Sequence, residues 1–386
     1  MGRKMKLVKM FIGMCLCVGA AIALASNSGS TVLTETLASH KLITRDGMLY
    51  YEAEGQGEPL ILVPGGPGAC RISFQPWFSR LSNNHQVVYY DAIGRGLSDR
   101  LGDPALYTVE RDVDDIENLR QALGVQRISL LGQSYGGIPA LAYALKYPAH
   151  VSHLVLSSAM ISAASFQANI DAANATMQMF YPAEWARVQA LRAIGVRSAD
   201  HRSEEEYAQL AEMMYWHDGR LASLMKQPSD PRERLDMTVY RAMLGENADF
   251  VVGGTLKGYD PLPMMHRLAA RTLVIGGRYD RVATPEIVAQ TYRSIPASLA
   301  QLAMFEHSGH RPWVEESDAY FARVSAFLDD QPTPAQVGTV MHPAGVDGTK
   351  PLAPIDARAA KDSGRSKTST YFLFLSNSLT IVGNSG

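Results

Sequence analysis

A serine stands between glycines at residues 132–136, which read Gly-Gln-Ser-Tyr-Gly. The apolar residues 128–131 come directly before this segment, and a helical pattern follows at residues 138–145. Gly-x-Ser-x-Gly between a strand and a helix is typical of a nucleophile elbow, a turn so tight that only glycines fit beside the serine. The spacing predicts that Ser134 presents its hydroxyl at the end of a strand, where it can attack a substrate.

A serine hydroxyl becomes a nucleophile when a base takes its proton, and a carboxylate must hold that base in the right tautomer. In this type of sheet the chain order is serine, then acid, then histidine. Asp280 follows a predicted strand at residues 272–275, and His310 follows another at residues 301–305. Active-site groups of open α/β sheets gather at the carboxyl ends of strands, so we expect Ser134, Asp280 and His310 to converge.

Each partner has an alternative interpretation. Asp280 could instead be a turn or cap residue before Pro285, and His307 competes with His310 for the role of base. We favour His310 because Gly309 permits a tight turn before it and a helix is predicted after it.

An acyl-transfer site also needs two backbone N–H groups aimed at the developing oxyanion. One is expected from Tyr135, which follows the serine. The other is expected from Gly66, in the loop Pro-Gly-Gly-Pro-Gly at residues 64–68 after a predicted strand at residues 60–63. Glycine lets the backbone approach a substrate closely. The alternative interpretation of these residues is an ordinary Gly-Pro turn.

With these motifs in place, the chain resembles proline iminopeptidase-type α/β hydrolases over residues 42–328. The shared motifs are Gly-Gly-Pro-Gly at residues 65–68, Asp-Ala-Ile-Gly-Arg-Gly-Leu-Ser at 91–98, Gly-Gln-Ser-Tyr-Gly-Gly at 132–137, Gly-Arg-Tyr-Asp at 277–280 and Ser-Gly-His at 308–310. The resemblance implies that Ser134, Asp280 and His310 form a catalytic triad. It also implies a helical cap over the substrate pocket.

Two departures from that family stand out. Pro64 replaces the histidine that usually precedes Gly-Gly-Pro-Gly, and the Trp-x-x-Trp-Glu segment whose glutamate helps hold the substrate amine is missing. Candidate substitutes are Glu184 and Glu212, with Trp216 as a further substrate-binding residue. A solvated helix face is the alternative explanation for such glutamates. Methionines and aromatic residues of the cap could line an apolar pocket or pack as helix core.

Strand patterns alternate with helical ones, which favours an α/β fold with a mostly parallel sheet covered by helices on both faces. No strand is predicted in residues 161–264, which we interpret as the helical cap. The α/β-hydrolase core then comprises residues 42–160 and 265–330, followed by a flexible tail at 331–386 that is rich in Pro, Gly, Ala, Thr and Ser. The predicted strands are residues 49–53, 60–63, 86–90, 128–131, 151–156, 272–275 and 301–305, and the last predicted helix is residues 313–328.

Residues 1–25 have the basic start, apolar middle and small-residue end of a secretory signal peptide, with an uncleaved anchor as the alternative. We therefore expect an exported protein, periplasmic or secreted, with no stable membrane insertion after cleavage. Cleavage would remove four basic residues and shift the formal net charge from −2 to −6, so a nucleic-acid partner is not expected. Cys70 would be the one remaining cysteine, which excludes an internal disulfide.

These features predict a serine hydrolase that acts through an acyl-enzyme on short peptides or other small molecules. An aminopeptidase of proline iminopeptidase type is favoured, and a carboxylesterase or other amide hydrolase with the same triad is the alternative. Dehalogenases and epoxide hydrolases need an aspartate where Ser134 stands. No metal or cofactor is expected, and the oligomeric state is left open.

Overall fold

The computed structural model describes residues 37–198, 200–207 and 210–332, except for the side chains of residues 204, 211 and 212. The predicted signal peptide and nearly all of the predicted tail lie outside the described residues. None of the helices in the described part of the chain is long and apolar enough to cross a membrane.

Eight strands form one sheet in the order β1-β2-β4-β3-β5-β6-β7-β8. The strands β4, β3, β5, β6, β7 and β8 run parallel to one another, whereas β2 pairs antiparallel with both β1 and β4 at one end of the sheet. The mostly parallel sheet is therefore confirmed. The strands are β1 (Ala38–Thr44), β2 (Gly47–Glu54), β3 (Glu58–Val63), β4 (His85–Asp91), β5 (Ile128–Gln133), β6 (Val151–Ser157), β7 (Arg271–Gly277) and β8 (Ala300–Phe305).

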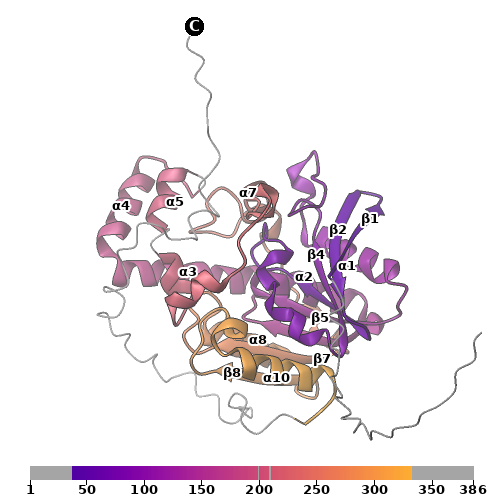
Figure 1. Ribbon diagram of the computed structural model, residues 1–386. Coiled ribbons are helices and arrows are strands. Elements are labelled where there is room, and N and C mark those ends of the chain that lie inside the picture. The colour runs from indigo at the N-terminus through magenta and orange to yellow at the C-terminus, as the bar shows by residue number, and fades with distance from the viewer. Residues whose placement is uncertain (1–36, 199, 208–209, 333–386) are drawn as a thin grey trace, which may run out of the picture. The chain divides into compact units, whose positions relative to one another are not determined.

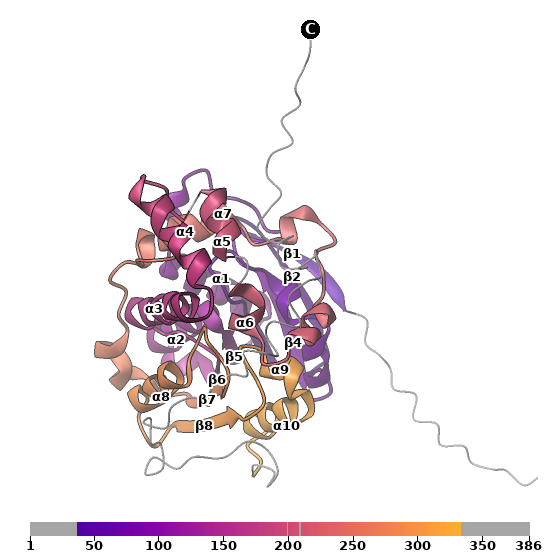
Figure 2. The ribbon, with the colours of Figure 1, turned by 90° about the vertical axis from the view of Figure 1, so that its left-hand side faces the viewer.

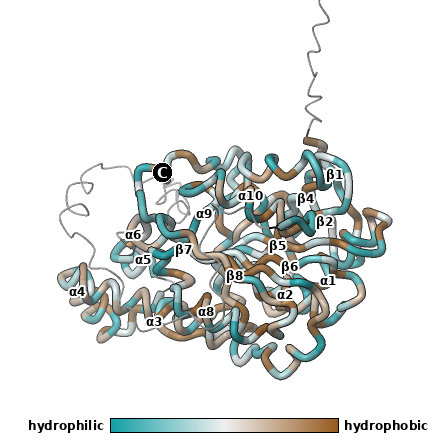
Figure 3. Tube along the Cα trace, turned by 90° about the horizontal axis from the view of Figure 1, so that it is seen from below, coloured by the Kyte–Doolittle hydropathy of each residue, from teal (hydrophilic) through white to brown (hydrophobic). Residues whose placement is uncertain are grey.

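Helices cover both faces of this sheet, and the strand sequences show why. Successive residues of β3 point to opposite faces: Ile61 and Val63 belong to one buried cluster, Leu60 and Leu62 to another. The first cluster includes α1 (Val109–Ala122), α2 (Gly137–Lys146) and α8 (Pro285–Ser294), and the second includes α10 (Ser317–Leu328). Figure 2 shows α2 and α8 on one side of the sheet and α10 on the other. Strands with two covered faces are mostly apolar, and β5 and β6, which lie in the middle of the sheet (Figure 3), are rich in Leu, Ile and Val.

The chain between β6 and β7 is helical, as predicted for the cap, and its helices gather together in Figure 1. The first of them starts at a capping box, in which Ser162 and Ser165 satisfy each other's backbone N–H groups. The cap helices are α3 (Ala163–Phe180), α4 (Pro182–Ala193), α5 (His201–Tyr207), α6 (Ala211–Tyr215) and α7 (Met237–Leu244).

Short 3-10 turns fill many of the connections. They are η1 (Arg71–Phe74), η2 (Trp77–Leu81), η3 (Pro104–Leu106), η4 (Ser134–Gly136), η5 (Pro148–His150), η7 (Gly219–Leu224), η8 (Pro231–Glu233), η9 (Gly254–Leu256) and η10 (Leu262–Arg267).

Two elements differ from the sequence-based expectation. β1 was not predicted: it begins four residues ahead of the predicted start of the core and is mostly exposed, so it carries no apolar run that would reveal it. The predicted helix at residues 313–328 is two helices, α9 (Pro312–Glu315) and α10, which meet at Glu316. The Glu316 carboxylate accepts hydrogen bonds from the His307 N–H and the Ser308 hydroxyl, and its backbone leaves the helical conformation.

Candidate active site

Ser134 occupies the sharp turn between β5 and α2. Its φ of +55° lies in the left-handed region, a conformation that costs a non-glycine residue energy and persists where the surroundings impose it. A side chain on Gly136 would overlap the carbonyl oxygen of Val63, and one on Gly132 would overlap that of Gly136. The glycines are therefore required by close backbone approach, as a nucleophile elbow demands.

Asp280 and His310 meet at the carboxyl ends of β7 and β8. The His310 Nδ1 lies 2.9 Å from Asp280 Oδ2, and both side chains are almost fully buried. The other oxygen, Oδ1, accepts hydrogen bonds from the N–H groups of Val282 at 2.8 Å and Ala283 at 2.9 Å. These two bonds fix the carboxylate plane, so Oδ2 must face the imidazole.

The other ring nitrogen of His310 faces Gln133. Because the Asp280 carboxylate can only accept at Nδ1, the neutral imidazole carries its proton there and a lone pair on Nε2. The Gln133 side-chain amide lies 3.0 Å from that Nε2 and donates to the lone pair. His307, by contrast, is exposed and does not border the cavity next to Ser134.

The loop that carries His310 is tied to the cap. The Glu315 carboxylate accepts the N–H of Gly309 at 2.6 Å through Oε2, and those of His217 and Asp218 at 2.8 Å each through Oε1. Burial raises the pKa of Glu315, although these three N–H groups oppose the shift. Gly309 allows this contact because a side chain there would strike the cap backbone at residues 215–217, so close approach explains this glycine.

Gly66 and Tyr135 are the candidate oxyanion donors. Gly66 has a φ of +51°, and its carbonyl oxygen accepts the N–H of Ala69 at 2.8 Å, which folds the loop into a tight turn. Gly66 and Ser134 border the same cavity. The N–H of Tyr135 directly follows Ser134 at the start of η4.

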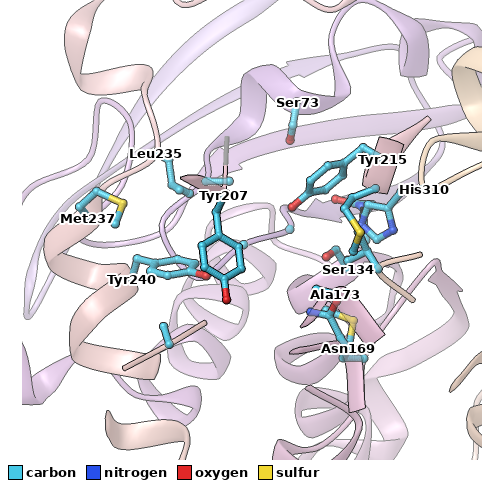
Figure 4. Close-up of a pocket in the computed structure, with 18 of the residues that line it drawn as sticks. Ser73, Ser134, Asn169, Ala173, Tyr207, Tyr215, Leu235, Met237, Tyr240 and His310 are labelled. Carbon is cyan, nitrogen blue, oxygen red and sulfur yellow. Dashed lines mark hydrogen bonds between the residues drawn. The ribbon is translucent and has the colours of Figure 1, made fainter. Parts of the chain in front are cut away.

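A cavity of about 370 Å³ separates the catalytic loops from the cap. Figure 4 shows Ser134 and His310 close together beneath Tyr215, with Tyr207 and Tyr240 farther along the cavity. The Tyr215 ring contacts the His310 ring edge-on, with centroids 5.2 Å apart. Much of the wall is apolar, including Met160, Phe166, Ile170, Leu210, Met214 and Val282.

Two of the three sequence-based candidates for substrate binding lie away from this cavity. Glu184 lies on α4, where it pairs with Arg187 at 3.1 Å, and it does not line the cavity. Trp216 is 4% exposed and packs in the core, while Tyr215 beside it lines the cavity. The side chain of Glu212 lies outside the described residues.

Two carboxylates that were not predicted do line the cavity. The first is Glu233, whose Oε1 pairs with Arg71 at 2.8 Å and whose Oε2 accepts the N–H groups of Ser229 at 2.9 Å and Asp230 at 3.1 Å. Burial opposes a lower pKa for Glu233, but the Asp230 and Ser229 hydrogen bonds and Arg71 hold its pKa below the ordinary value. Glu233 is thus a charged group that already has its partners.

The second is Asp249. Burial raises the pKa of Tyr207 and of Tyr240, and the negative charge of Asp249 raises both further. All three residues border the cavity, so Asp249 brings a negative charge close to both phenols. Among the described residues no group of three or more His, Cys, Asp or Glu side chains is placed to hold a metal ion.

The chain belongs to the alpha/beta hydrolase fold family, whose model matches residues 58–316. Within that family it is a proline iminopeptidase-like α/β hydrolase. A proline iminopeptidase from Clostridioides difficile is 30% identical over 286 residues, covering 72% of this chain and 94% of the relative. One from Saccharolobus solfataricus is 28% identical over 284 residues, covering 72% and 87%.

The crystal structure of a proline iminopeptidase from Mycobacterium smegmatis has the same fold, with a TM-score of 0.63. It is 23% identical in sequence, and the match covers 76% of this chain and 98% of that one.

Proposed function

We propose that this hydrolase uses Ser134 as a nucleophile and forms an acyl-enzyme. The observation that carries the proposal is the 2.9 Å contact between His310 and Asp280 beside the strained Ser134 turn. The carboxylate holds the imidazole in the tautomer whose Nε2 can accept a proton, which is what a general base requires. The Ser134 hydroxyl takes the place of the Gln133 amide at this nitrogen when it attacks.

The Ser134 oxygen bonds to the substrate carbonyl carbon while its proton moves to His310 Nε2, and the carbonyl oxygen becomes an oxyanion held by the N–H groups of Gly66 and Tyr135. The tetrahedral intermediate collapses, and His310 gives the proton to the leaving amine or alkoxide. Water, activated by the same histidine, then hydrolyses the acyl-serine.

We favour an aminopeptidase of proline iminopeptidase type as the finer function, supported by the relatives above. A protonated substrate amine in an enclosed cavity needs a negative partner, because an unpaired buried charge is costly. Asp249 is our candidate for that partner, since it borders the cavity and its negative charge acts on Tyr207 and Tyr240 in the same wall.

The alternative is a carboxylesterase or other amide hydrolase with the same catalytic residues. The apolar part of the cavity wall supports it, because an acyl chain without charge would bind there without any carboxylate. The two functions differ in what they require of the substrate's amine.

Fluorophosphonate labelling tests the proposed nucleophile, and a substrate panel tests the choice between aminopeptidase and esterase. A fluorophosphonate should modify the enzyme at Ser134, and Ser134→Ala should remove both labelling and turnover; turnover by that variant would contradict the mechanism. For an aminopeptidase, Asp249→Asn should raise KM about tenfold or more for free-amine anilides and leave a simple ester unchanged. Equal turnover of free and blocked amines, with no effect of Asp249→Asn, would favour the esterase.

Export through residues 1–25 is also a proposal, supported by the basic, apolar and small-residue regions of that segment. N-terminal sequencing of the protein recovered from the periplasm or medium tests it. A mature start near Ser26 is expected, and a retained Met1 would contradict cleavage.

A further inference from the structure

A fully buried ion pair lies behind the oxyanion hole. Arg95, in the loop after β4, binds Asp112 of α1 through two hydrogen bonds, Nη1 to Oδ1 at 2.5 Å and Nη2 to Oδ2 at 3.0 Å. Each residue is 2% exposed. Such a pair adds little net stability, because desolvating two charges costs about as much as their attraction returns. Its contacts indicate another role.

The first contact reaches the loop that supplies one oxyanion donor. Arg95 Nε donates to the carbonyl oxygen of Pro67 at 2.5 Å, and Nη1 also donates to the carbonyl oxygen of Ile93 at 3.1 Å. The Pro67 carbonyl and the Gly66 N–H lie on different peptide units of the same short loop, so this hydrogen bond anchors the loop just after the donor.

The second contact reaches the other donor. The Tyr135 hydroxyl donates to Asp112 Oδ2 at 2.7 Å, and the backbone N–H of the same tyrosine is the second oxyanion donor. One carboxylate–guanidinium pair therefore joins the two segments that must act together. The sulfur of Met243, on cap helix α7, lies 3.3 Å from Arg95 Nη2 and 3.5 Å from the Tyr135 hydroxyl, which packs the cap against the same pair.

We propose that Arg95 and Asp112 are positioning residues for the oxyanion hole, holding the loop that contains Gly66 and Pro67 at a fixed separation from Tyr135. The inference rests on the proposed acyl-enzyme function. Oxyanion donors are effective because they are already aligned with the position that the negative charge will take. Loosening them should weaken binding of the transition state and leave binding of the substrate nearly unchanged.

Two sets of variants test the proposal. Arg95→Met alone would leave Asp112 charged and buried, so it is combined with Asp112→Leu. The double variant should lower kcat about 10²-fold with KM changed less than about threefold. Tyr135→Phe keeps the backbone N–H and the ion pair, and removes one link. It should lower kcat by a smaller factor, about three- to tenfold.

The decisive measurement is the affinity for a trifluoromethyl ketone, whose adduct with Ser134 places an oxyanion in the hole. That affinity should fall in parallel with kcat in both sets of variants. Arg120→Met is the matched control, because Arg120 pairs with Glu117 on the same helix at 2.7 Å but does not border the cavity. It should leave kcat and the ketone affinity unchanged.

A lower melting temperature with unchanged kcat and ketone affinity in the double variant would show that the pair is structural only, and would overturn the proposal. If the double variant does not fold, Tyr135→Phe decides: unchanged kcat and ketone affinity overturn the proposal, and a parallel loss supports it. Fluorophosphonate labelling of the unmodified enzyme separates this outcome from failure of the proposed function. Labelling at Ser134 with unaffected variants refutes only the positioning role, whereas no labelling refutes the nucleophile itself.

Discussion

Replacing Asp280 by asparagine tests the proposed mechanism most directly. In Asp280→Asn the remaining carbonyl oxygen keeps the N–H bonds of Val282 and Ala283, at 2.8 and 2.9 Å in the native enzyme. The new NH2 group must then stand where Oδ2 stood, 2.9 Å from His310 Nδ1. A donor there forces Nδ1 to accept, so the ring proton moves to Nε2 and His310 can no longer take the proton of Ser134.

The expected loss follows from that tautomer change. In serine proteases the same substitution lowers kcat about 10⁴-fold, which corresponds to about 5 kcal/mol of transition-state stabilisation. The assay is the second-order rate of fluorophosphonate labelling at neutral pH, which requires no knowledge of the natural substrate, together with kcat on a chromogenic ester. The melting temperature separates lost chemistry from lost folding.

Asp260→Asn is the matched control, because Asp260 is exposed and makes only a local contact, accepting the Leu262 N–H at 3.0 Å. It should label at the native rate. An Asp280→Asn variant that folds and keeps more than about a tenth of the native labelling rate would refute the tautomer argument. Asp280 would then serve mainly to shape the loop before α8.

Three further predictions concern other parts of the site. His310→Ala should abolish fluorophosphonate labelling, whereas His307→Ala should leave it nearly native; the reverse result would reassign the base. Gly136→Ala should slow labelling more than about tenfold and lower the melting temperature, because the new methyl group would overlap a carbonyl oxygen of β3. Gly102→Ala, where nothing lies within 4 Å of the added carbon, should do neither, and equal effects of the two would contradict the steric argument. Burial raises the pKa of the Cys70 thiol well above its ordinary value, so iodoacetamide at pH 8 should modify it only on unfolding. Reductant should not change the melting temperature. Rapid alkylation of the folded enzyme would show that the thiol is accessible.

Much of the catalytic arrangement could be predicted because it depends on short segments. Each strand that precedes a candidate catalytic residue is a short, mostly apolar run, and the glycines around Ser134 mark a turn that few other residues allow. The preference for His310 over His307 also agrees with where the structure places them. Gly309 has a second role that the sequence did not reveal, because it is needed for contact with the cap as well as for the turn.

The substrate side of the site could not be predicted in the same way. Glu233 and Asp249 lie in irregular cap segments, and their sequence neighbours resemble those of surface acids. Whether such a residue faces the cavity depends on how the cap helices pack, as the placement of Glu184 on the outside of α4 shows. Trp216 does not line the cavity, whereas the preceding residue, Tyr215 at the end of α6, does.

The Glu315 carboxylate limits how far the cap and the catalytic core can change independently. One side chain holds the loop before His310 and the cap backbone at residues 217–218, so a cap taken from another hydrolase would leave this carboxylate without two of its three donors. The cap is therefore not an interchangeable module. New substrate preferences can arise by changing side chains that line the cavity, whereas replacing the whole cap requires a matching change in the loop that carries the base.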